Sequence, residues 1–213
     1  MSEKKYSSKL EKEYYSAHWP KEPISFEHLI PYITCWLDPK IFNAKRVLDI
    51  GAGECAYTRL ILENFNPKEI VASDIFIERM MPTIKHNKNK KLKFIQSDVF
   101  NLPFVENSFD VVFGSLVLSQ LRELDKIGYQ LAKVLKQNGL FIGIEPNPFN
   151  PIHLYRQLKG SHSKNLFLLM PKHFKTFEKL GFEIKVSFFH GRIPWLKGKL
   201  LASLMGITGK IKK

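Results

Sequence analysis

Apolar positions along this chain of 213 residues follow two different spacings. Short, nearly continuous apolar runs are typical of buried strands, and apolar residues three or four positions apart are typical of amphipathic helices. The runs that predict strands are RVLDI (46–50), EIVASD (69–74), KLKFIQSD (91–98), FDVVFGS (109–115), LFIGIEP (140–146) and FEIKVSFFH (182–190). The segments that predict helices are 24–38, interrupted near Pro31, and 56–65, 75–86, 118–136 and 171–181. This alternation predicts an α/β fold with a Rossmann-like, mostly parallel, doubly wound sheet and helices on both faces.

The end of the chain has a further helical pattern with a basic side. Its apolar residues recur every three or four positions, at Ile193, Leu196, Leu200, Leu204, Ile207 and Ile211. We therefore expect three regions. They are a helical N-terminal extension or lid over 1–44, a core over 45–190, and a basic amphipathic helix over 191–213 that packs on or beside the core.

Charge is distributed unevenly along the chain. The formal net charge is +13, and the stretch from Arg156 to Lys213 contributes +11 of it, from thirteen basic and two acidic residues. This asymmetry suggests an anionic partner, although lysine is plentiful throughout the chain. A basic amphipathic helix over 192–213 would suit peripheral contact with an anionic membrane, and contact with nucleic acid is the weaker alternative.

Composition favours a cytoplasmic protein that is at most peripheral to a membrane. Cys35 and Cys55 are too few for a disulfide framework, and the N-terminus lacks the apolar stretch of a signal peptide. No cluster of cysteine and histidine has the spacing of a metal site, so we predict no metal.

The turn after the first predicted strand is the first candidate for chemistry. The stretch Gly51-Ala52-Gly53 would bring bare backbone against a nucleotide-like cofactor. Together with Ala56 it fits the dinucleotide pattern, and Asp74 lies at the right distance to bind a ribose. An NAD(P)-binding oxidoreductase is therefore one alternative.

Two acids favour S-adenosylmethionine over a dinucleotide. Asp49 precedes the turn, where its charge would oppose a pyrophosphate but favour an ammonium or sulfonium group. Asp98, at the end of the third predicted strand, can accept from an adenine amino group, and the Val99 N–H can donate to the ring. The turn with Asp49, then Asp74, then Asp98 would thus contact the amino-acid, ribose and adenine parts of S-adenosylmethionine in that order.

Five stretches in order resemble the class I S-adenosylmethionine-dependent methyltransferases, particularly the type-11 small-molecule group. They are VLDIGAGECAYT, IVASDIF, FIQSDVFNLPFVENSFDVVFGSLVLSQL, AKVLKQNGLFIGIEP and, more weakly, PKHFKTFEKLGFEI. The resemblance implies that Gly51 and Gly53 lie under the cofactor, that Asp74 binds the ribose hydroxyls and that Ile75 flanks adenine. It also implies that Asp98 and Val99 contact the base and that Ser115 lines the methionine end. The family often has a third glycine where Cys55 stands, so helical backbone angles are required of that cysteine.

The acceptor would be bound by residues after the fourth and fifth strands. Glu145 is the first candidate for a general base or polar anchor and His153 the second. Glu145 could instead order its loop, and His153 could lie on a surface helix. We predict a methyltransferase acting on a small-molecule or a lipid- or glycan-linked acceptor. Two alternative functions are an RNA methyltransferase that uses the basic C-terminal face and a non-catalytic cofactor-binding module.

Overall fold

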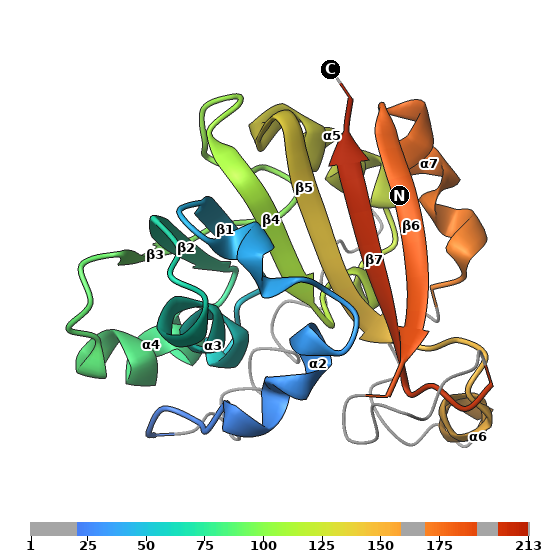
Figure 1. The fold of residues 1–213 in the computed structure, drawn as a ribbon, viewed down its shortest axis with the longest axis horizontal. Coiled ribbons are helices and arrows are strands. Elements are labelled where there is room, and N and C mark those ends of the chain that lie inside the picture. The colour runs from blue at the N-terminus through green and yellow to red at the C-terminus, as the bar shows by residue number, and fades with distance from the viewer. Residues whose placement is uncertain (1–20, 159–168, 191–199, 213) are drawn as a thin grey trace, which may run out of the picture.

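A computed structural model describes residues 21–158, 169–190 and 200–212 of the chain. Its centre is a seven-stranded sheet with the strand order β3-β2-β1-β4-β5-β7-β6 (Figure 1). All neighbouring pairs from β3 to β5 are parallel, and β7 is antiparallel to both β5 and β6. The predicted α/β fold with a mostly parallel, Rossmann-like sheet is confirmed.

The strands match the predicted apolar runs, except that β5 begins at Leu135, inside the helix predicted over 118–136, and that one strand is added near the C-terminus. Their bounds are β1 Arg46–Ile50, β2 Glu69–Asp74, β3 Leu92–Gln96, β4 Phe109–Ser115, β5 Leu135–Pro146, β6 Phe182–Phe189 and β7 Leu204–Ile211. The α-helices are α2 Pro31–Thr34, α3 Ala56–Asn64, α4 Ile77–His86, α5 Leu124–Val134, α6 Pro151–Leu158 and α7 Lys175–Lys179. Short 3₁₀ helices are η1 Glu27–Leu29, η2 Pro39–Phe42, η3 Leu118–Gln120 and η4 Pro171–Phe174.

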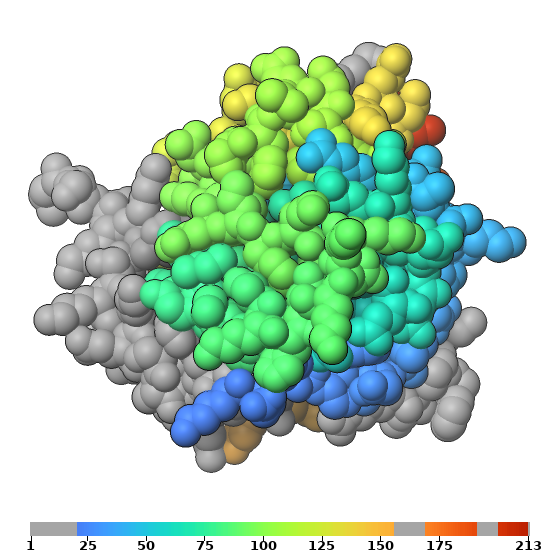
Figure 2. Space-filling view, turned by 90° about the vertical axis from the view of Figure 1, so that its left-hand side faces the viewer, coloured from blue at the N-terminus to red at the C-terminus, as the bar shows by residue number. Residues whose placement is uncertain are grey.

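Helices cover both faces of the sheet, and each face has its own apolar core. One core joins α5 and α7 to the sheet through buried residues such as Ile127 and Phe177. The other joins α2, α3 and α4 to the opposite face through residues such as Ile33, Leu60 and Met80. Figure 2 views the molecule from the β3 edge, where residues of α4 and β3 form the front and the chain from residue 21 runs beneath them.

The described part of the predicted N-terminal extension is attached to the core by several contacts. The indole ring of Trp36 stacks on Phe189 of β6, with ring centroids 5.2 Å apart. The Arg59 guanidinium of α3 lies over the ring of Phe26 and donates to the Ile24 carbonyl at 2.9 Å. The portion of the predicted lid before residue 21 lies outside the described residues.

The predicted C-terminal amphipathic helix is wrong for residues 204–211. These residues form β7, which pairs with β5 on one side and β6 on the other. Burial alternates along this strand: Met205, Ile207, Gly209 and Ile211 are buried, whereas Leu204 and Thr208 are partly exposed and Lys210 is exposed. The start of the predicted helix, residues 191–199, lies outside the described residues. No helix among the described segments is long and apolar enough to cross a bilayer.

Candidate functional site

Strand order reverses between β1 and β4, which are neighbours in the sheet although β2 and β3 separate them in the sequence. Ligands of open α/β sheets bind beyond the carboxyl ends of the strands at such a switch point. The turn after β1 lies there, and Gly51 and Gly53 have φ angles of +63° and +52°. Those left-handed angles suit glycine, so the backbone conformation accounts for both glycines.

The turn is fixed to the end of β2 by Asp74. One oxygen of this carboxylate accepts the Gly53 N–H at 2.9 Å, and the other accepts the Phe76 N–H at 2.9 Å. Asp74 is 4% exposed, and burial raises its pKa above the ordinary range. The structure therefore brings together the predicted glycine turn and the predicted ribose ligand.

Asp49 lies in β1 under the same turn and faces α3. Its carboxyl accepts the Thr58 hydroxyl at 2.5 Å, and it is 2% exposed. Burial raises its pKa to about 7, and the nearby charge of Asp74 adds to the increase. A cation placed beside Asp49 would favour its ionised form and would bind more tightly for that reason.

Arg79 on α4 was not predicted from the sequence, yet its guanidinium lies against the glycine turn. It donates to Glu54 at 2.8 Å, and its Nη1 is 4.0 Å from Asp74 Oδ2. A Cβ atom added to Gly53 would come within 2.7 Å of Nη2. No spacing in the sequence relates Arg79 to residues 53 and 54, because only the packing of α4 brings them together.

Cys55 does not meet the expectation of helical backbone angles. Its φ of 63° and ψ of 26° place it in the left-handed region, directly before the first residue of α3. The side chain is fully buried, and burial raises the pKa of the thiol. A left-handed conformation costs a non-glycine residue about 1–2 kcal/mol, so the cysteine adds strain at a position that suits glycine.

The end of β3 lies beside the end of β2 and carries the predicted adenine contacts. The Ser97 N–H donates to the Asp74 carbonyl at 3.0 Å. The next residue, Asp98, accepts the Phe100 N–H at 2.9 Å, and Val99 packs against the core. Ile75 is partly exposed at the start of the loop after β2, where its carbonyl accepts from Gln96. Their contacts with adenine remain predictions.

The end of β4 closes the other side of the turn. Ser115 is partly buried beside Tyr57, and Val117 lies over the glycines. A Cβ atom added to Gly51 or Gly114 would meet the Val117 side chain at 2.6 Å or 2.8 Å. Between Ser115 and Val117, Leu116 has a left-handed φ of 56° and is 44% exposed. An exposed, strained leucine at the site entrance is a candidate contact for an apolar acceptor.

Glu145 orders the loop that follows β4. Its two carboxylate oxygens accept the N–H groups of Leu118 and Ser119, at 2.8 Å and 3.2 Å. The residue is fully buried, and burial raises its pKa to about 7. These contacts are those of a positioning residue, and its predicted role as a base stays a prediction. His153 lies partly buried on α6, and its predicted role is likewise untested.

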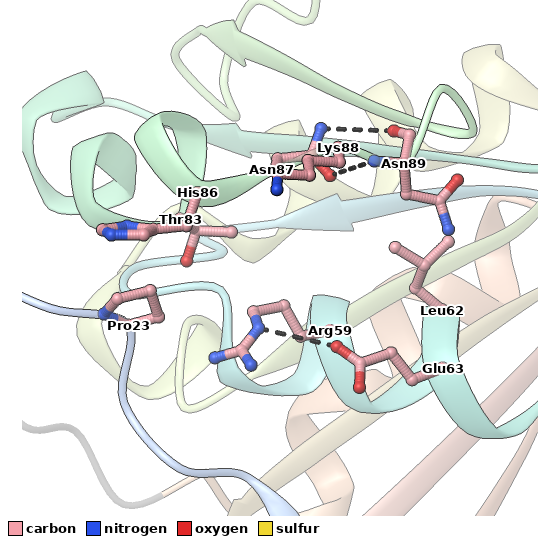
Figure 3. Close-up of a pocket in the computed structure, with 9 residues that line it drawn as sticks. All are labelled: Pro23, Arg59, Leu62, Glu63, Thr83, His86, Asn87, Lys88 and Asn89. Carbon is pink, nitrogen blue, oxygen red and sulfur yellow. Dashed lines mark hydrogen bonds and ion pairs between the residues drawn. The ribbon is translucent and has the colours of Figure 1, made fainter.

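A cavity of about 340 Å³ lies elsewhere, between α3, α4 and the chain near Pro23 (Figure 3). Two of its basic side chains already have partners. Arg59 bonds the Ile24 carbonyl and lies 3.7 Å from Glu63, and His86 lies 3.4 Å from Glu22. None of its lining residues belongs to the predicted site, so the cavity does not identify a ligand.

Known proteins match the part of the chain that contains the glycine turn. A family described as "Methyltransferase domain" matches residues 48–143. The chain is 30% identical over 105 residues to a sterol 24-C-methyltransferase of Gibberella zeae, with 45% of this chain and 26% of that protein covered. It is 31% identical over 133 residues to the arginine-hydroxylase NDUFAF5 of Rattus norvegicus, with 57% and 36% covered. The chain thus spans well under half the length of both curated relatives.

A solved structure shows the same fold. The S-adenosylmethionine-dependent methyltransferase from Mesorhizobium loti superposes with a TM-score of 0.69 at 15% identity. The match covers 86% of this chain and 97% of that one. The seven-stranded arrangement therefore has a known counterpart over nearly the whole of that chain.

Proposed function

We infer that the domain over residues 48–143 belongs to the class I, S-adenosylmethionine-dependent methyltransferases of the type-11 group, because the family described as a methyltransferase domain matches these residues. From this premise we propose that the protein methylates a small-molecule or lipid-linked acceptor. The cofactor of the family is S-adenosylmethionine, whose sulfonium supplies an activated methyl group and leaves as a neutral thioether. The protein's contribution to such an in-line displacement is mainly alignment of the acceptor with the methyl group.

One observation carries the proposal: Asp74 holds the glycine turn in place above the buried carboxyl group of Asp49. The left-handed Gly51 and Gly53 present bare backbone, and Asp74 is held in place by two N–H donors. Asp49 needs a cationic partner to be stably ionised at neutral pH. These groups fit a ligand with a ribose and positive charge, and they fit a pyrophosphate poorly.

Each group has a distinct role in this proposal. Gly51 and Gly53 would lie beneath the cofactor, Asp74 would accept from its ribose hydroxyls, and Asp49 would favour its cationic end. Asp98 and Val99 would contact adenine, with Ile75 beside it and Ser115 near the methionine end.

Glu145 would hold the loop at 117–120, and Val117 on that loop would exclude water from the turn. Alignment of the acceptor with the methyl group then depends on a rigid loop, and the buried Glu145 carboxylate makes this loop rigid.

The residues at the entrance support an acceptor with apolar surface. Leu116 is exposed there, and the 3₁₀ helix η3 continues with the buried residues Leu118 and Ser119. An apolar side chain at the entrance favours an acceptor with apolar surface over a free polar metabolite. One similar protein, from Gibberella zeae, is by its name a sterol methyltransferase.

The test is transfer of a labelled methyl group from S-adenosylmethionine into a cell extract, followed by separation of organic-soluble, aqueous small-molecule and RNA fractions. We expect label in the organic or small-molecule fraction with the full chain. Asp74→Ala should reduce the transfer by about tenfold or more at limiting cofactor, and Asp125→Ala, which removes an exposed carboxylate from α5, should not. Label in RNA would replace the proposed acceptor with nucleic acid, and unlabelled fractions throughout would contradict methyl transfer.

A further inference from the structure

Exposed apolar side chains gather at one corner of the molecule. Among the described residues, nine large apolar side chains are exposed, and five of them lie in two short segments. One segment is on α6, where Ile152, Leu154 and Tyr155 are 60%, 43% and 56% exposed. The other precedes β7, where Leu200 and Leu201 are 63% and 57% exposed. We name these five residues the apolar corner.

Two buried amides hold the segments of the apolar corner together. The side chains of Asn147 and Asn150 both donate to the Ala202 carbonyl, at 2.7 Å and 2.9 Å. Asn150 also accepts the Ile152 N–H at 2.9 Å and so caps the start of α6. Figure 1 shows α6 beyond the carboxyl end of β5, beside the chain that leads into β7. The two segments are therefore fixed side by side.

This exposure is built into the fold. Asn147 and Asn150 are 0% and 7% exposed, and Ala202 is fully buried. Buried polar groups bonded in this way are costly to rearrange, so the backbone at Ala202, which directly follows Leu200 and Leu201, is held in place. A set of exposed apolar side chains fixed at one place marks a surface that meets an apolar partner.

The sequence around the apolar corner is basic and has no acid. No Asp or Glu occurs from residue 146 to 177 or from residue 184 to 213. In the sequence, basic residues follow the first segment at Arg156, Lys159 and Lys164 and precede the second at Arg192, Lys197 and Lys199. Apolar side chains among cations suit the interface of a bilayer that contains anionic lipid, where the apolar groups enter the acyl boundary and the cations meet headgroups.

We propose that the apolar corner docks the protein on an anionic membrane surface. Its location differs from the one expected from the sequence, because residues 204–211 are a buried strand and cannot lie on a bilayer. The docking surface is instead formed by α6 and the residues just before β7. It does not depend on the proposed methyl transfer, since binding to lipid requires neither cofactor nor turnover.

The experiment is flotation of the full chain with vesicles of phosphatidylcholine, with and without about one third phosphatidylglycerol. We expect binding to the anionic vesicles, weakened by salt at about 0.5 M because screening reduces the attraction. The test variant carries Ile152→Glu and Leu201→Glu. Its matched control carries Val105→Glu and Tyr129→Glu, two side chains that are 76% and 60% exposed outside the apolar corner.

Both variants change the net charge equally, so a difference in vesicle binding between them depends on where the substituted residues lie. Partition into anionic vesicles should fall about tenfold or more in the Ile152→Glu, Leu201→Glu variant and much less in its control. No vesicle binding by the unmodified chain, or equal losses in both variants, would overturn the proposal, as would retention of RNA without retention of vesicles.

If the acidic pair prevents folding, Ile152→Ser with Leu201→Ser makes the same comparison without added charge. A cofactor titration on each variant separates loss of docking from loss of the methyltransferase site.

Discussion

Two buried carboxyl groups near the site, Asp49 and Glu145, have similarly raised pKa values in different surroundings. Glu145 accepts two backbone N–H groups, so its ionised form has local donors and a structural task. Asp49 accepts one hydroxyl and lies near the second carboxylate of Asp74. Asp49 is thus the carboxyl whose charge most needs a ligand, because its protein partners compensate it least.

The pH dependence of stability should report the raised pKa of Asp49. Asp49 has a pKa of about 7 in the folded chain against an ordinary value of 3.8. The folded state therefore keeps a proton that the unfolded state loses between these values. The free energy of unfolding should fall as pH rises from about 4 to about 7, by up to about 4 kcal/mol for this group, and then level off.

Asp49→Asn should make that decline shallower, because the substituted side chain cannot ionise, and Glu145 should account for much of the decline that is left. Chemical denaturation between pH 5 and pH 8 measures the slope, with Asp125→Asn as the control for an exposed carboxyl. Parallel curves for Asp49→Asn and the unmodified chain would show that Asp49 is ionised in the fold at low pH.

Sequence reasoning identified the candidate residues that directly follow or end strands, and it missed those that reach the site through packing. Asp49, Gly51, Gly53 and Asp74 stand at strand ends, where chain order alone predicts proximity. Arg79 is different, because its position over Gly53 depends on the orientation of α4. The roles predicted for Asp98, Val99, Ser115, Glu145 and His153 in binding or catalysis remain predictions.

At the scale of elements, the central strands were predictable and β7 was not. The apolar residues of 193–211 are three or four positions apart, which is the spacing of a helix. In the structure β7 pairs on both edges, and Met205, Ile207 and Ile211 are buried whereas Thr208 and Lys210 are not. These three apolar residues have the even spacing of a strand, which the helical spacing of the neighbouring leucines and isoleucines obscured. Gly206 and Gly209 were the available signal, since two glycines weaken a helix.

Gly206 offers a direct test of the position of β7. A Cβ atom there would lie 2.5 Å from the Trp36 ring, so Gly206→Ala should reduce the free energy of unfolding by about 1–3 kcal/mol. In a Trp36→Leu background the same change should cost less, because the obstructing ring is gone. Lys210→Ala, an exposed position of the same strand, serves as the control. Equal costs in both backgrounds would contradict the packing of β7 on Trp36.

The predicted helix over 118–136 also differs from the structure at its start. Residues 118–120 form the 3₁₀ helix η3, and α5 begins at Leu124. The Glu145 carboxylate takes the N–H groups of Leu118 and Ser119 and so fixes the loop in that conformation. A contact 26 or 27 residues away in the sequence cannot be inferred from local periodicity.

At the scale of the whole molecule, the proposed cofactor site and the proposed docking surface lie at the same end of the sheet, beyond the carboxyl ends of the parallel strands. The carboxyl ends of β1, β2 and β4 frame the glycine turn, and β5 leads from Glu145 to α6 at the same edge (Figure 1). The apolar corner and the cofactor site would then share one side of the protein. A membrane-borne acceptor would be reached without leaving that side.

The measurement that tests the central claim most directly is a calorimetric titration of the full chain with S-adenosylmethionine, S-adenosylhomocysteine and NADH. The account predicts micromolar binding of the two sulfur compounds and none of NADH. Asp74→Ala should weaken binding by about tenfold or more, since a charge-assisted hydrogen bond contributes about 1.5–3 kcal/mol, whereas Asp125→Ala should leave it unchanged. Binding of NADH alone, or of none of the three, would contradict the assignment of the glycine turn to S-adenosylmethionine.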